Sequence, residues 1–127
     1  MGERLKLVQG DTGPPVIVQL SDANGAIDVS DAGTAVRMYF REEGTETILA
    51  TLAGTKLTGY DPGTGVINQS APYNVPGKGG RVQFTWVGST ALDNEAGQYE
   101  GEVEITFTSG VVQTGWDLVK FKIRESF

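Results

Sequence analysis

Short runs in which apolar and polar residues alternate occupy most of the chain, and turn-forming residues close each run. In the segment 35–41, Val36, Met38 and Phe40 share one face, and Arg37, Tyr39 and Arg41 share the other. Neighbouring side chains of a strand point to opposite faces, so this pattern predicts a strand that is buried on one side and wet on the other. Similar runs predict strands at 5–8, 16–20, 47–52, 81–86, 99–107 and 111–124, and shorter runs stand at 27–29, 56–58 and 66–67. Helical signals are confined to a single predicted turn at 89–94.

Seven or eight short strands without long helices are typical of a β-sandwich or a barrel. The segment 92–101 favours the sandwich, because Asp93, Gly97 and Tyr99 stand just before a long alternating strand. In immunoglobulin-like domains a tyrosine at this point hydrogen-bonds back to the backbone and fixes a corner of the fold. The sequence therefore predicts an all-β, immunoglobulin-like antiparallel sandwich. It forms one domain over 1–127, with a long irregular glycine- and proline-rich connection at about 59–80.

The last two strands predict a hairpin closed at Ser109-Gly110, which would place Ile105 opposite Thr114 and direct even-numbered residues of the last strand inward. Beyond it, the apolar set is odd-numbered: Val119, Phe121 and Ile123. A change of parity requires one extra residue, so a β-bulge is expected near Asp117-Leu118. After the bulge, Lys120 is expected opposite Glu100, and Lys122 opposite Gln98.

Charge and composition narrow the classes of function. The formal net charge is −6 over 127 residues, and the basic residues are scattered, which argues against nucleic-acid binding. The chain has no cysteine and no histidine, so disulfides, thiolate chemistry and the commonest general base are excluded. No apolar run approaches the roughly 20 residues of a membrane span. Because the N-terminus also lacks an apolar segment of signal-peptide type, synthesis and folding in a reducing cytoplasm are expected.

Candidate chemistry is sparse, and no catalytic residue, metal ligand or cofactor is predicted. Glu100, Glu102 and Glu104 project from one strand face at a spacing that paired glycosidase carboxylates use, but a solvated face opposite lysines is the better interpretation. Oxygen ligands of the kind that calcium binds occur in a turn-rich region without the spacing of a known calcium loop; they are Asp22, Asn24, Asp28 and Asp31. Trp86 and Trp116 lie at inward parity, which favours core packing over a ligand platform. The protein is predicted not to be an enzyme.

Several motifs, taken in order, resemble a known family. The chain opens with Gly10-Asp11 before an apolar strand, continues through Gly80-Arg81-Val82-Gln83-Phe84 and Ala96-Gly97-Gln98-Tyr99, and ends with Gly110-Val111-Val112-Gln113-Thr114 and Phe121-Lys122-Ile123. This order is similar to the N-terminal domain of upper baseplate proteins of tailed bacteriophages and to related small tail proteins. The chain departs from that pattern at Trp116-Asp117, and it ends at Phe127, where such proteins continue into a helical or fibre region.

The resemblance implies a structural component of a tailed-phage virion, made in the host cytoplasm: a baseplate or tail connector that anchors receptor-binding or fibre proteins. Other virion proteins are the expected partners, and a homo-oligomer (a trimer or ring) is expected. Binding to nucleic acid or to a membrane is not expected. The alternative is a capsid decoration protein, or a module that binds carbohydrate or cell surface, on the same fold. Candidate contact residues are Arg37, Tyr39 and Arg41 on the solvent-exposed face and Tyr60 and Tyr73 in the long connection. The segment 5–15 is a further candidate contact surface.

Overall fold

Most of the alternating runs form strands of one curved sheet in the computed structural model, which describes residues 5–11, 15–23, 25–61, 64, 66–86, 92, 95–115 and 118–126. The short run at 27–29 does not form a strand, and 66–67 lies in a separate small hairpin. The strands are β1 (Leu5–Val8), β2 (Val16–Gln19), β3 (Ser21–Asp22), β4 (Gly25–Ala26), β5 (Ala35–Glu42), β6 (Ile48–Lys56), β7 (Tyr60–Asp61), β8 (Val66–Ile67), β9 (Arg81–Phe84), β10 (Gly97–Thr106), β11 (Val112–Thr114) and β12 (Val119–Arg124). The described part of the chain contains no α-helix, which confirms the all-β class. The turn expected at 89–94 lies outside the described residues except for Leu92.

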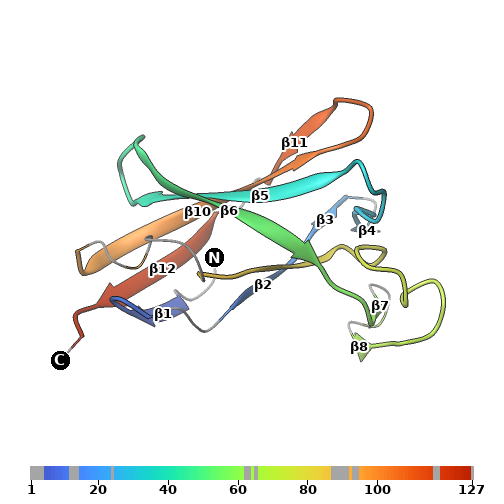
Figure 1. Ribbon diagram of the computed structural model, residues 1–127, viewed down its shortest axis with the longest axis horizontal. Coiled ribbons are helices and arrows are strands. Elements are labelled where there is room, and N and C mark those ends of the chain that lie inside the picture. The colour runs from blue at the N-terminus through green and yellow to red at the C-terminus, as the bar shows by residue number, and fades with distance from the viewer. Residues whose placement is uncertain are drawn as a thin grey trace.

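The main sheet has the order β1-β12-β10-β5-β6-β9-β2, with β11 paired to β10 beside β12. It curls into a half-barrel, so that β2 and β9 face β10 and β12 across the core (Figure 1). All neighbours on this path are antiparallel except β1 and β12, which run parallel, so the sheet is mixed. Two small hairpins, β3–β4 and β7–β8, complete the described strands.

Strand β6 is what joins the two sides of the half-barrel. It pairs with β5 up to Ala53 and then with β9 from Gly54 onward. A Cβ on Gly54 would lie 2.5 Å from Val82 Cγ1 and 3.0 Å from the carbonyl oxygen of Val36, so the close approach requires glycine. The sequence suggested a strand ending at Leu52 and a separate one at 56–58; the structure instead has one continuous strand that changes partner at this glycine.

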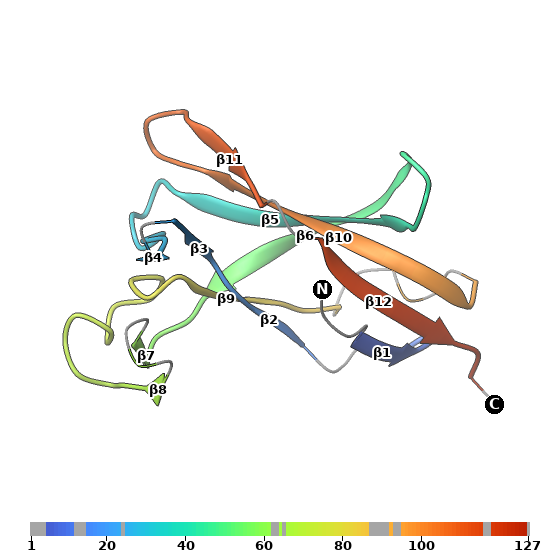
Figure 2. The same ribbon diagram turned by 180° about the vertical axis from the view of Figure 1, so that it is seen from behind.

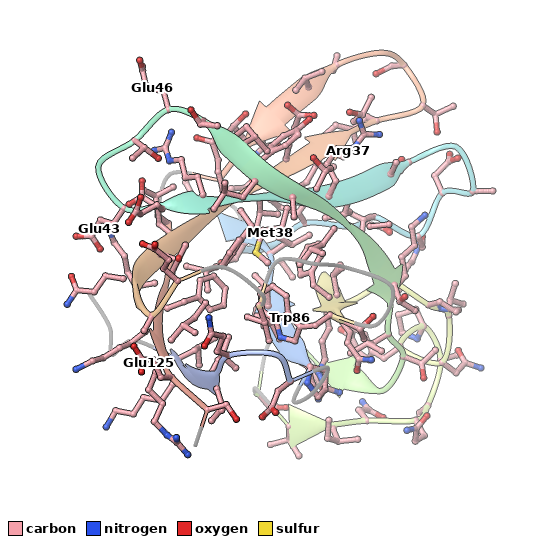
Figure 3. The ribbon with its side chains drawn as sticks, turned by 60° about the vertical axis from the view of Figure 1, so that its left-hand side comes forward. Arg37, Met38, Glu43, Glu46, Trp86 and Glu125 are labelled. Carbon is pink, nitrogen blue, oxygen red and sulfur yellow. The ribbon has the colours of Figure 1, made fainter. Side chains whose placement is uncertain are left out.

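The core lies inside the curve of the sheet, where the residues predicted to face inward are buried. Trp86 packs edge-on against Phe40, with ring centroids 5.3 Å apart, and against Phe121 at 5.6 Å. Figure 3 shows Met38 and Trp86 pointing into this interior, whereas Arg37 points away from it. Alternation therefore identified the buried faces of β5, β9 and β10 correctly; their buried residues are Val36, Met38, Phe40, Val82, Phe84, Tyr99, Val103 and Ile105.

The final hairpin differs from its prediction by one residue. Ile105 pairs with Gln113 rather than Thr114, because Phe107 N–H donates to the Val111 carbonyl at 2.9 Å and closes a three-residue loop. Gly110 completes that loop with φ of 93°, the left-handed position of such turns. The expected inward direction of Val112 is therefore wrong: it pairs with Thr106 and is exposed.

The interruption of the last strand is present but is larger than expected. Glu104 faces Thr114 and Gly101 faces Val119, so three steps along β10 match five along the last strand. Two residues are extra rather than one, and odd-numbered residues face inward on both sides of the break. Asp117, one of the two positions named for the bulge, lies outside the described residues. The pairs predicted beyond the break, Glu100 with Lys120 and Gln98 with Lys122, are confirmed.

Candidate docking surface

The wet face of β5 and β10 carries a network of opposite charges. Glu100, only 6% exposed, accepts hydrogen bonds from Arg41 Nε at 2.8 Å and from Lys120 Nζ at 3.0 Å. Burial alone would raise the pKa of Glu100, but its hydrogen bonds and ion pairs with Lys120 and Arg41 outweigh burial and hold that pKa below its ordinary value. This carboxylate holds β5, β10 and β12 together, so the structure gives it a role in the fold.

The three candidate contact residues of that face stand opposite acidic residues of β10. Arg37 pairs with Glu104 in register and Tyr39 with Glu102, while the Tyr39 hydroxyl donates to Glu104 Oε1 at 3.0 Å. Arg41 forms its 2.7 Å ion pair with Glu100. All three side chains are half-buried, and two of them, Tyr39 and Arg41, already have partners within the chain.

The predicted corner brings Tyr99 back onto the segment that precedes it. The Tyr99 hydroxyl donates to the backbone carbonyl of Glu95, while its ring is buried and stacks on Phe40 at 5.2 Å. Burial raises the pKa of this hydroxyl, and the charges of Glu42 and Glu95 raise it further. Gly97 begins β10 with φ of 156°, a conformation that L side chains rarely adopt. Asp93, the third residue of the predicted corner, lies outside the described residues.

The long connection brings its two candidate tyrosines close along the backbone. Gly59 N–H donates to the Tyr73 carbonyl at 2.7 Å, so the start of β7, which contains Tyr60, runs beside the turn at Tyr73. The Tyr73 side chain is half-buried. Further along the same hairpin, Val66 and Ile67 of β8 expose their apolar side chains.

Two of the aspartates considered for calcium act as local anchors. Asp28 Oδ1 accepts from Ser30 N–H at 2.9 Å, and Asp28 Oδ2 forms an ion pair with Lys78 at 3.1 Å. Asp31 Oδ1 accepts from Gly33 N–H at 2.9 Å and from the Thr108 hydroxyl at 2.7 Å, and these bonds lower the pKa of Asp31. Asp22 lies in β3, and Asn24 is outside the described residues. Within the described ranges, no three acidic side chains gather as a metal site would require.

A groove at the open seam of the half-barrel was missed by the sequence analysis. It has a volume of about 410 Å³ and lies between β2–β3 on one side and β10, β11 and the start of β12 on the other. Its walls are mainly aliphatic, and among them Val18, Ile27 and Val119 are core residues that remain half-covered because the two sides part here. No sequence signal could reveal it, since it arises where the last strand breaks and where β2 has no second neighbour among the described strands.

Strand β2 borders this groove as an uncharged edge. Leu20 N–H donates to Gly80 O at 2.7 Å, so in this antiparallel pair Val16, Val18 and Leu20 bond toward β9. The alternation directs the backbone groups of Ile17 and Gln19 to the open side. The stretch 12–21 contains no charged residue, and proteins usually place charges on an exposed edge to prevent further pairing.

The β11 hairpin borders the groove from the other side. It projects from the end of β10 beyond the body of the sheet, at the same end of the molecule as β3 (Figure 2). Val111 and Val112 are 60% and 54% exposed, and the stretch 105–116 contains no charged residue. Groove, β2 edge and β11 hairpin thus form one continuous surface in which Asp22 is the one charged residue among the described groove-lining residues. We call it the seam surface.

The arrangement suits binding by shape and strand pairing. Comparisons with protein families, with curated proteins and with solved structures give no match to this chain. No helix among the described residues is long and apolar enough to cross a membrane.

Proposed function

We propose that this protein is a non-enzymatic assembly module, a structural component of a tailed-phage virion that connects tail or baseplate proteins. The observation that carries the proposal is the seam surface, with the edges of β2 and β11 that have no partner among the described strands, a mainly aliphatic groove and two exposed valines. Such edges bind extended segments of partners through main-chain hydrogen bonds, and the groove adds side-chain specificity. The likeness of its motifs to upper baseplate domains supports a place at the tail.

The same proposal includes an immunoglobulin-like origin for the fold. Matching β2, β5, β6, β9, β10 and β12 to strands B to G of that fold gives the neighbours B-E-D and C-F-G, which are its two characteristic sheets. Tyr99 then stands at the start of strand F, where the corner tyrosine of that fold belongs. The bend of β6 at Gly54 connects what would otherwise be two separate sheets.

Immunogold labelling of purified particles, with an antibody raised against the folded protein, tests the proposed location. Label at the tail or baseplate is expected. Label over the capsid would assign the protein to decoration instead. Particles that remain unlabelled, with an antibody shown to bind the native protein and with a known tail protein labelled in parallel, would overturn a virion role.

Carbohydrate or cell-surface binding is the second candidate, favoured by the backbone hydrogen bond from Gly59 to Tyr73, which places the start of β7 beside the turn at Tyr73. Aromatic rings combine apolar area with a polar group, as sugar platforms need. Glycan-array binding by the isolated protein, lost on Tyr73→Ala but retained on Tyr39→Ala, would support it. An array without signal would remove this candidate and leave the assembly role untouched.

A further inference from the structure

We propose that the seam surface binds a second copy of this chain, with the β11 hairpin of each copy seated on the β2 edge and groove of the other. The inference rests on the proposed assembly function and names its partner. An exposed apolar projection and a mainly aliphatic recess lie side by side on one molecule.

The recess has both of the features that strand addition requires. The backbone groups of Ile17 and Gln19 point to the open side of β2, and β2 itself carries no charged side chain that would oppose a further strand. Beside it, the half-covered Val18, Ile27 and Val119 present aliphatic surface that an added strand would cover.

The projection supplies matching chemistry. β11 pairs with β10 on one side only among the described strands, so its outer edge can pair with β2 of another copy. Val111 and Val112 remain more than half exposed within the described residues of their own copy, and valine side chains fit an aliphatic groove. The β11 hairpin cannot fill the groove of its own copy, because its pairing with β10 makes it part of one wall of that groove.

The low charge of the seam surface favours a second copy there. Each copy carries a formal charge of −6, so two copies repel one another where their charged faces meet. Among the described residues that line the groove, Asp22 alone is charged, and the stretch 105–116 brings no charge to it. Two like-charged copies therefore meet little electrostatic repulsion at the seam surface.

Because the β11 hairpin and the groove lie next to each other on one surface, the expected arrangement of two copies is a twofold symmetric dimer. A surface that contains both can bind its own twin across a twofold axis, with each hairpin filling the other copy's groove. This makes a closed dimer the expected unit, in place of the trimer or ring expected from the sequence.

Analytical ultracentrifugation with matched lysine variants tests the interface. Wild type is expected to be a concentration-dependent dimer. Val112→Lys and Ile17→Lys are expected to raise the dimer dissociation constant about tenfold or more, because each puts an unpaired charge into the contact. Val66→Lys and Ile48→Lys are the controls: Val66 is 61% exposed and Ile48 46%, against 54% for Val112 and 47% for Ile17, and both lie outside the seam surface. Circular dichroism confirms that each variant is folded.

Cysteine cross-linking provides a second measurement, because the natural chain has no cysteine. A Val112→Cys copy mixed with an Ile17→Cys copy is expected to form a mixed disulfide under mild oxidation, and a Val66→Cys copy mixed with Ile17→Cys is not. A wild type that stays monomeric at millimolar concentration, or a dimer that the four lysine variants weaken equally, would overturn the proposal.

The two proposals fail separately. A monomer that nonetheless labels at the phage tail would refute the second-copy inference and keep the virion role. If the protein forms a dimer that depends on Val112 and Ile17 but is absent from purified particles, the second-copy inference stands and the virion role is refuted.

Discussion

The hydroxyl of Tyr99 donates a hydrogen bond to the backbone carbonyl of Glu95, four residues upstream, while its ring stacks on Phe40 in the core. One side chain thus fixes both the entry to β10 and the packing of β10 on β5. The buried ring orders the strand, and the hydroxyl orders the segment that leads into it.

Tyr99→Phe is expected to keep the ring packing and lose the hydrogen bond. The free energy of unfolding should fall by about 1–2 kcal/mol, since the carbonyl of Glu95 loses a partner at a buried hydroxyl. Urea denaturation measures the change. Tyr39→Phe, which removes a hydroxyl bonded to Glu104 on the wet face, is the control and should cost less because water can replace that partner. An equal loss in both variants would show that the corner bond has no special weight.

Glu100→Gln is expected to destabilise the protein at neutral pH by about 1–3 kcal/mol, because it leaves Arg41 and Lys120 without their shared carboxylate. The folded-state pKa of Glu100 lies below the ordinary value of 4.5, so its contribution is complete above that pH and is lost as the pH falls through the folded-state pKa. The difference in unfolding free energy between wild type and Glu100→Gln should therefore shrink in acid.

Denaturant unfolding measured from neutral to acidic pH checks this, with Glu102→Gln on the same strand as the control. A difference between wild type and Glu100→Gln that stays constant below pH 4.5 would mean that packing, and not charge, accounts for the effect.

Gly54→Ala is expected to destabilise the fold by about 1–3 kcal/mol, because the added methyl meets Val82 and the Val36 carbonyl where β6 changes partner. Thermal unfolding followed by circular dichroism measures it. Thr55→Ala, at the exposed neighbouring position, is the control and should change little. If Gly54→Ala unfolds at the wild-type temperature, the two sides of the half-barrel have more freedom to separate at this point than the structure indicates.

The sequence predicted the structure correctly where one face of a strand is buried. It failed where turn geometry sets the register of a strand or where the topology leaves a strand edge exposed. Met38, Phe84 and Ile105 were placed inside because burial enforces a period of two. Val112 was misplaced because a three-residue loop ending at Gly110 and a two-residue loop differ by one step, and a single sequence does not distinguish them. The seam surface was missed because it depends on which strands lack neighbours, a property of the whole topology.

The open edge of β2 makes a final prediction that a monomer alone can test. In a monomeric variant such as Val112→Lys, the Val18 amide, which bonds toward β9, should exchange slowly with solvent, and the amides of Ile17 and Gln19 should exchange fast. Residue-resolved hydrogen exchange by NMR measures all three. In wild type at a concentration where it associates, the Ile17 and Gln19 amides should gain protection, because the added strand takes their hydrogen bonds. Equal protection of the three amides in the monomeric variant would mean that the β2 edge is already covered within one copy, and the seam surface would lose the feature on which docking depends.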